Sequence, residues 1–383
     1  MTTFDDIRPY NDSEAAAALH KAAFNPLSLR VSKYLFPNES IFYFPHLLRN
    51  VESVSDFQEN VMSKCIEAIM NKTSDGILVK GIDNIKNLNS AYVVISNHRD
   101  IVMDPAILEL TLFREGLPLT ELCVGSNLLS LGYVRNLMRS NRMIKVMRGM
   151  SSREIYECSQ TLSSYIRHTV CETGRPVWIA QREGRAKNGL DATEQAVLKM
   201  LNMSGSGSFE DNWKSLPVIP MSISYEYESC DALRARELLI SRTEKYVKKK
   251  GEDINSILTG IRQKKGHVCI CFGKAITNEE IETAAANNGN ERFRTLCSIL
   301  DSRIVEGYHL WKTNYIAADL INSNEGDNAN KKYSDKYSAE DLQSFERFTD
   351  KQLETVDVSQ ESRAELREIY LRIYANPVLR LEK

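Results

Sequence analysis

The chain lacks the long apolar segments that mark membrane-spanning proteins. Nowhere do its 383 residues reach the ~20 consecutive apolar residues that a helix needs to cross a bilayer. The first residues, MTTFDD, include neither the basic segment nor the apolar segment of a secretory signal peptide. We therefore expect a cytoplasmic protein that is peripheral where it meets the inner face of a membrane.

The eight cysteines lack the spacing of a metal site or of a disulfide framework. None of them forms a C-x-x-C pair, the usual sequence sign of zinc-binding or redox cysteines. Cys269 and Cys271 alternate along a predicted strand and would point to opposite faces, so they would not share one metal ion. We expect buried, reduced thiols and no bound metal.

The chain also lacks a large net charge, which is -2 at pH 7. Binding of a polyanion would therefore depend on a local cluster of basic residues. Such a cluster lies between positions 122 and 153, a stretch without Asp or Glu. Its basic residues are Arg135, Arg139, Arg142, Lys145, Arg148 and Arg153.

Two interpretations of this basic cluster stay open. It could be the solvated face of an amphipathic helix, which has no function of its own. It could also contact anionic lipid headgroups, an acidic carrier protein or the phosphates of coenzyme A. No motif that reads nucleic acid accompanies the cluster, and we expect no nucleic-acid partner.

Periodicity divides the chain into three predicted parts. Residues 1–75 carry helical patterns broken by prolines, and we expect an N-terminal helical unit. Residues 76–277 alternate apolar strand-like segments with helical ones, which is typical of an α/β domain. Residues 278–383 are polar and helical, and their last helix, near 361–375, is expected to pack on that domain.

The middle part should form the sheet. Its predicted strands are 92–95, 120–124, 177–180, 218–223 and 268–271, and its predicted helices are 105–113, 134–140, 151–169 and 191–202. Strands that alternate with helices usually pair in parallel. We therefore expect an α/β fold with a mixed, largely parallel sheet and helices on both of its faces.

A histidine stands where the first of these strands ends. His98 lies in a polar loop before a helix, with Asp100 and Asp104 two and six residues later. Histidine can take up a proton near pH 7, and a carboxylate on its second nitrogen fixes the tautomer. The pattern indicates a general base that activates a hydroxyl, although a structural histidine at a helix start would have the same neighbours. No second histidine has the spacing of a metal site, and no G-x-S-x-G suggests a serine nucleophile.

A dense group of charges follows the strand predicted at 177–180. Arg182, Glu183, Arg185 and Lys187 surround Gly184, which would let the backbone approach a ligand closely. Arginine offers a planar fork to phosphate oxygens and lysine a point charge. We expect a phosphate site here, with Glu183 orienting a cation or a substrate hydroxyl; solvated loop charges are the alternative.

Four segments in this order resemble the glycerol-3-phosphate / lysophosphatidate acyltransferase superfamily, whose catalytic unit is a PlsC-like acyltransferase domain. They cover residues 96–107, 141–148, 178–187 and 216–223. The resemblance implies transfer of a fatty acyl group from acyl-CoA or acyl-carrier protein, with no other cofactor. The implied acceptor is glycerol-3-phosphate or lysophosphatidate.

The resemblance also implies roles for individual residues. His98 would be the general base, oriented by Asp104 and helped by Glu183. The substrate would be bound by Asn97, Arg99, Asp100, Arg148, Gly184, Arg185 and Lys187.

Two departures from the family pattern leave alternatives open. Five residues separate His98 from Asp104 where the family usually has four, so Asp100 is a second candidate partner. Ala186 stands where the family usually has an arginine. The alternatives are an acyltransferase for a lipid without glycerophosphate, such as an acylated amino acid, and a non-catalytic, membrane-associated lipid-binding protein of the same fold.

Overall fold

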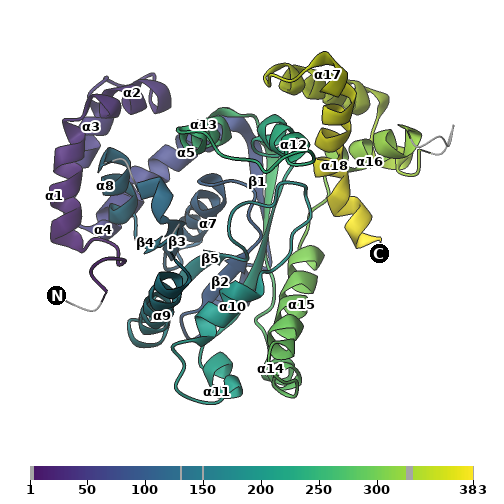
Figure 1. Ribbon diagram of the computed structural model, residues 1–383. Helices are drawn as coiled ribbons and strands as arrows, with labels where there is room; N and C mark the ends of the chain where they lie inside the picture. The colour runs from purple at the N-terminus through teal and green to yellow at the C-terminus, as the bar shows by residue number, and fades with distance from the viewer. Residues whose placement is uncertain (1–3, 130–131, 149–150, 325–330, 383) are drawn as a thin grey trace.

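The structure is a computed structural model that describes residues 4–129, 132–148, 151–324 and 331–382. A seven-stranded sheet in the order β1-β7-β6-β2-β5-β3-β4 runs through its centre (Figure 1). The strands are β1 (Ser74–Lys80), β2 (Val93–Ser96), β3 (Glu121–Gly125), β4 (Met143–Val146), β5 (Val177–Ala180), β6 (Val218–Tyr225) and β7 (Gly266–Phe272). All neighbours pair in parallel except β6 and β7, which are antiparallel.

Helices cover both faces of the sheet because its central strands are apolar on both sides. Val93 and Ile95 of β2 face a core shared with α9 (Ser152–Arg167), α10 (Gln195–Asn202) and α15 (Glu291–Glu306). Val94, between them, faces the opposite core, where α7 (Met103–Arg114) packs through Leu108 and Leu112. The sheet is therefore the middle layer of three, as predicted for the α/β class.

The N-terminal segment folds into short helices that pack beside α7 and α8 (Gly132–Ser140). They are α1 (Asp12–Ala23), α2 (Pro26–Leu35), α3 (Tyr43–Arg49), α4 (Val54–Asp56), the π-helix η1 (Phe57–Met62) and α5 (Ser63–Thr73). Asn11 caps α1 by accepting a hydrogen bond from the Glu14 backbone N at 2.9 Å. Pro26 begins α2, where its missing N–H costs nothing. Leu19, Phe44 and Phe57 share one buried core with α5 and α7.

The remaining helices connect the strands or follow the sheet. They are α6 (Asp83–Lys86), α8 (Gly132–Ser140), α11 (Phe209–Lys214), α12 (Asp231–Ile240), α13 (Glu252–Arg262), α14 (Asn278–Ala285), α16 (Lys312–Asn324), α17 (Ala339–Glu354) and α18 (Arg363–Leu381). Helices α14 and α15 cover the sheet, whereas α16, α17 and α18 form a core of their own with α12. This C-terminal group and α1–α3 lie at opposite sides of the molecule (Figure 1).

The predicted fold class, a largely parallel sheet with helices on both faces, is confirmed. The five predicted strands all form, but β1 and β4 are two further strands, one at each edge of the sheet. The helix predicted at 191–202 begins only at Gln195, and the last helix runs past 375 to Leu381 with Pro377 inside it. Within the described parts of the chain, no helix combines the length and apolar character needed to cross a membrane.

Candidate active site

The carboxyl ends of five strands meet at one edge of the sheet, and a cavity of about 360 Å³ opens there. The loop after β2 brings His98 to it, the loop after β5 brings residues 182–188, and Arg148 follows β4. Ligand sites in open α/β sheets form at this edge because the loops that leave parallel strands converge there. The cavity therefore gathers segments that are far apart in the sequence.

His98 lines this cavity and is held by Asp104, which does not line it. Its Nδ1 lies 2.9 Å from Asp104 Oδ2, and 13 % of its side chain is exposed. The rings of His98 and Trp178 pack in a T-shaped arrangement, with their centroids 5.9 Å apart. When the carboxylate accepts the Nδ1 proton, Nε2 is left as the basic nitrogen. The pair has the geometry that general-base chemistry requires.

Asp104 is itself fixed by several donors. Its Oδ2 accepts the backbone N–H groups of Arg99 at 2.6 Å and Asp100 at 2.9 Å. Its Oδ1 accepts the Tyr225 hydroxyl at 2.8 Å, and both side chains are fully buried. Burial, together with the charges of Asp104 and Asp100, raises the pKa of Tyr225 well above its usual value. Tyr225 therefore remains a protonated donor at physiological pH.

The open choice between Asp104 and Asp100 is decided by this geometry. Asp100 Oδ1 accepts the backbone N–H groups of Val102 at 2.8 Å and Met103 at 2.7 Å, where α7 begins. Its Oδ2 accepts the Ser229 hydroxyl. Asp100 thus shapes the loop so that the fifth intervening residue is accommodated, and Asp104 reaches the imidazole.

Three residues predicted to bind substrate do not line the cavity. Asn97, Arg99 and Asp100 are each 2 % exposed or less, and each side chain hydrogen-bonds to other protein groups. Asn97 donates to the Ile223 carbonyl at 3.0 Å, and its Oδ1 accepts the Ile223 N–H at 2.8 Å, which ties the loop to β6. The prediction that these three residues bind substrate is therefore wrong, because their side chains make hydrogen bonds within the protein.

Arg99 is the centre of a buried ionic network. Its guanidinium lies 2.6 Å from Asp191 Oδ2 and 3.1 Å from Glu228 Oε1. Burial alone would lower the pKa of Arg99, but these two carboxylates raise it above its ordinary value. Arg234 binds the other oxygen of Glu228 at 2.9 Å, and Tyr308 donates to Asp191. The network anchors the loop that carries His98 to the segments around 191 and 228.

Charged side chains line the cavity together with His98. The cations are Arg148, Arg182, Arg185, Lys187 and Lys248, and the carboxylates are Glu183, Glu237 and Asp253. Lys187 pairs with Glu237, Lys248 with Asp253 at 2.7 Å, and Arg148 Nε lies 3.6 Å from Glu183 Oε1. Arg185 Nη1 is buried without a hydrogen-bond partner among the described residues. The surplus of cations suits an anionic group of a substrate.

The comparison with protein families identifies this part of the chain. Residues 76–224 match the sequence model of the Acyltransferase family. This match supports assigning the matched part, residues 76–224, to the PlsC-like acyltransferase superfamily. Among solved structures the chain is similar to the 1-acyl-sn-glycerophosphate (LPA) acyltransferase PlsC from Thermotoga maritima. The identity is 12 %, the match covers 75 % of this chain and 94 % of that chain, and the TM-score is 0.43. No curated protein matches the sequence.

The acyltransferase domain departs from its family at Ala186, and the structure gives the reason for an alanine there. Ala186 is fully buried, and its backbone N donates to the His98 carbonyl at 2.9 Å. Its neighbours Arg185 and Lys187 both line the cavity. Gly184 also lines it and has a φ of +72°, which favours glycine.

Several residues of the acyltransferase site escaped prediction from the sequence. Tyr225, Asp191 and Glu228 hold Asp104 and Arg99, yet each lies more than ninety residues from the group that it contacts. Lys248, on the cavity wall, was not among the residues predicted to bind substrate. The one signal in the sequence was that Tyr225 and Glu228 follow the predicted strand 218–223 closely, and loops after such strands meet at one edge.

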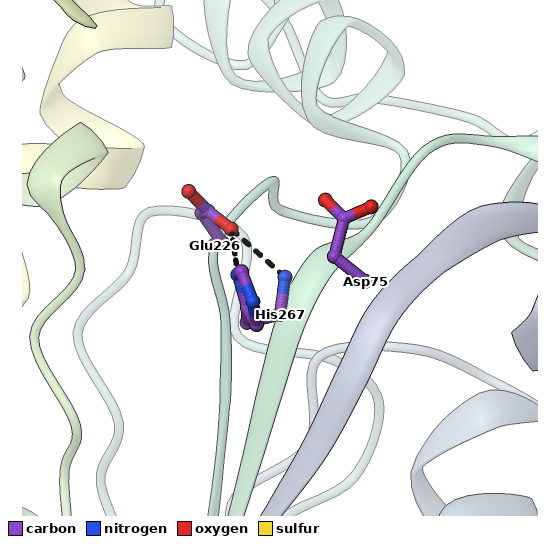
Figure 2. Close-up of side chains that lie close together, drawn as sticks. All are labelled: Asp75, Glu226 and His267. Carbon is purple, nitrogen blue, oxygen red and sulfur yellow. Dashed lines mark hydrogen bonds and ion pairs between the residues drawn. The ribbon is translucent and has the colours of Figure 1, made fainter.

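One group in the described parts of the chain has metal-ligand chemistry, and it lies outside the acyltransferase cavity. Asp75, Glu226 and His267 place their ligand atoms within 4.8 Å of one another. Figure 2 shows that Glu226 and His267 face each other while Asp75 lies on the neighbouring strand. His267 Nδ1 lies 2.8 Å from Glu226 Oε2, so these two form an ion pair when the histidine is protonated. None of the three lines the cavity.

Proposed function

We propose that the protein transfers a fatty acyl group from acyl-CoA or acyl-carrier protein to a hydroxyl of glycerol-3-phosphate or lysophosphatidate. The observation that carries this proposal is the His98–Asp104 pair, 2.9 Å apart, beside a cavity that five cations also line. A base is needed to activate a hydroxyl, and cations are needed to hold a phosphate. Both stand on one cavity of an acyltransferase domain.

The proposed mechanism uses direct attack of the acceptor on the thioester. His98 Nε2 takes the proton of the acceptor hydroxyl while its oxygen forms a bond to the thioester carbonyl carbon. The tetrahedral oxyanion collapses, the carbon–sulfur bond breaks, and the imidazolium returns the proton to the thiolate. Asp104 stabilises the imidazolium and, because Tyr225 and two backbone N–H groups hold it, keeps the ring oriented.

The acceptor's phosphate would lie against Arg185, Lys187 and Arg148. Arg185 is the strongest candidate because its buried Nη1 has no partner among the described residues. Lys187 and Arg148 are held by Glu237 and Glu183, which fixes them but leaves donors for a ligand. In this scheme Glu183 supports catalysis indirectly, because it orients Arg148.

A second acceptor class also has support. The cavity contains three carboxylates, and Ala186 replaces the family's arginine. An acylated amino acid bears an ammonium or amide beside its carboxylate, which suits a wall of mixed charge. The third candidate, a non-catalytic lipid-binding protein, differs by making no product.

We further propose that the protein meets an anionic membrane surface or an acyl carrier protein on the cytoplasmic side. Lys248 belongs to a basic segment beside the cavity, and its side chain is half exposed. A basic rim attracts either an anionic lipid surface or an acidic carrier.

The test is a screen with purified full-length protein. Labelled acyl-CoA and acyl-carrier protein are each offered with glycerol-3-phosphate, lysophosphatidate or an N-acylated amino acid, and the products are resolved. The proposal predicts an O-acylated glycerophosphate from at least one donor. A product only from the amino-acid lipid would select the second class, and no acylated product from any pair would refute acyl transfer to these acceptors.

A further inference from the structure

A second cavity lies at the opposite edge of the sheet, where β3, β4 and β5 begin. Its volume is about 500 Å³. Arg142, directly before β4, and Arg175, shortly before β5, both line it, together with Gln58 of the π-helix η1. None of these residues lines the catalytic cavity. The acyltransferase mechanism leaves this cavity without a role.

Arg142 is a half-buried cation with no direct ion pair among the described residues. Its Nη2 donates to the Ser55 hydroxyl at 2.8 Å, and its buried Nε has no partner among the described residues. No carboxylate in the described parts of the chain forms an ion pair with it. Burial, followed by the charge of Arg175, lowers its pKa, although the charges of Glu121, Glu109 and Asp12 act in the opposite direction. Its φ of +53° is a left-handed conformation that a non-glycine residue adopts at a cost, and such conformations concentrate at functional sites.

The negative charges near the two arginines are weak counter-ions. Arg175 Nη1 lies 3.7 Å from Glu121 Oε1, beyond hydrogen-bond distance. Glu121 is buried, which raises its pKa, and it already accepts the Tyr165 hydroxyl at 2.8 Å. Burial also raises the pKa of Glu109, beside this cavity, to about 7. Glu59 also lines this cavity, but it forms no ion pair with either arginine among the described residues. The two guanidinium groups therefore face one space with only partial compensation of their charge.

Gln58 adds a third donor from another element. The side chain is 4 % exposed, and its Nε2 has no partner among the described residues. It stands on a π-helix, a conformation that is rare and often marks functional sites. An unpartnered buried amide costs free energy unless a ligand or a water molecule satisfies it. Arg142, Arg175 and Gln58 together form a donor set for an acceptor-rich ligand.

We propose that this cavity binds an oxyanion of the phosphate class, as inorganic phosphate, a phosphomonoester or a lipid phosphate headgroup. Arginine forks match the geometry of phosphate oxygens, and the charge of a phosphate would offset the repulsion between Arg142 and Arg175. Phe113, Leu117 and Leu119 line the rest of the cavity, so it also accepts the apolar part of a phosphorylated lipid. This site does not depend on the proposed reaction. Arg142 precedes β4 and Arg148 follows it, so the two arginines lie at opposite ends of that strand.

The test measures phosphate binding by calorimetry at constant ionic strength. All variants are made in the full-length R148Q/R185Q protein, because these two substitutions weaken phosphate binding in the catalytic cavity. Added R142Q or R175Q should weaken the remaining phosphate binding at least tenfold. R153Q is the matched control, because Arg153 is 89 % exposed and pairs with Glu157 on a surface helix. Circular dichroism shows whether each variant folds. Because Arg175 is half exposed, R175Q is expected to fold even if R142Q does not.

The source of the phosphate is resolved by a second arm with phosphatidylcholine vesicles that contain or lack phosphatidate. Binding of inorganic phosphate that R142Q or R175Q abolishes supports a site for free phosphate. Binding only to phosphatidate vesicles, lost in the same variants, supports a site for the lipid headgroup. Binding that neither variant alters, or no binding in either arm, overturns the proposal.

Discussion

Replacing Tyr225 with phenylalanine tests how the catalytic pair is held. The change removes the hydroxyl that donates to Asp104 Oδ1 at 2.8 Å and leaves the ring in place. A hydrogen bond to a charged group contributes about 1.5–3 kcal/mol. Since ~1.4 kcal/mol corresponds to a factor of ten in rate, full loss of this interaction in the transition state would lower kcat by about tenfold to a hundredfold.

The direction of the pH effect follows from the same hydrogen bond. Without the Tyr225 hydroxyl, Asp104 loses one hydrogen-bond donor that stabilises its negative charge. The carboxylate therefore interacts more strongly with protonated His98. His98 must be neutral to accept a proton, and its protonated form gains stability in the variant. The acid limb of the kcat/KM profile is therefore expected to move to higher pH.

The assay compares kcat/KM for wild type and Tyr225→Phe from pH 5 to pH 9 with the preferred thioester and acceptor. Tyr165→Phe is the matched control, because Tyr165 is also buried and also donates to a buried carboxylate, Glu121, at 2.8 Å. Both variants should lose about 1–3 kcal/mol of unfolding free energy, but only Tyr225→Phe should change the profile. A folded Tyr225→Phe enzyme with the wild-type kcat and acid limb would refute the positioning role.

Three further predictions concern stability and substrate binding. Arg99→Met leaves Asp191 and Glu228 without their shared cation, so chemical denaturation should show a loss of about 3–5 kcal/mol; a loss below about 1 kcal/mol would contradict the buried network. Burial raises the pKa of Glu109 to about 7, so the unfolding free energy of wild type should fall as pH rises from about 5 to 7. Glu109→Gln should lack this contribution to the pH dependence of stability. The same pH dependence in both proteins would contradict the raised pKa of Glu109. Arg185→Gln should raise KM for a phosphate-bearing acceptor about tenfold or more, and an unchanged KM would remove Arg185 from the phosphate site.

The sequence predicted the centre of the sheet better than its edges, and burial explains the difference. Strands β2 and β5 are buried on both faces and appear as short apolar runs. At the edges, β1 alternates partly buried and exposed residues and begins with Ser74, Asp75 and Gly76, and β4 has a single buried residue. Edge strands need fewer apolar side chains, so their pairing is decided by contacts that the local sequence does not record.

The same limit applies to the candidate site. His98, Glu183, Gly184, Arg185 and Lys187 were recognised because each chemically distinctive group directly follows an apolar strand. The chain does not reveal locally that Arg99 turns inward, since that depends on carboxylates about ninety and one hundred thirty residues away. Local sequence supplies the chemistry of a loop, and tertiary contacts decide which of its side chains reach the cavity.

The most direct measurement is acyl transfer by His98→Ala, with Asp104→Asn and Asp100→Asn assayed beside it. His98 as general base predicts that His98→Ala folds normally and loses at least ~10²-fold in kcat. Asp104→Asn should show a similar loss of kcat. Folded Asp100→Asn should lose less kcat, because Asp100 binds the backbone at the start of α7 and not the imidazole. Turnover by His98→Ala at the wild-type rate would contradict the proposed mechanism.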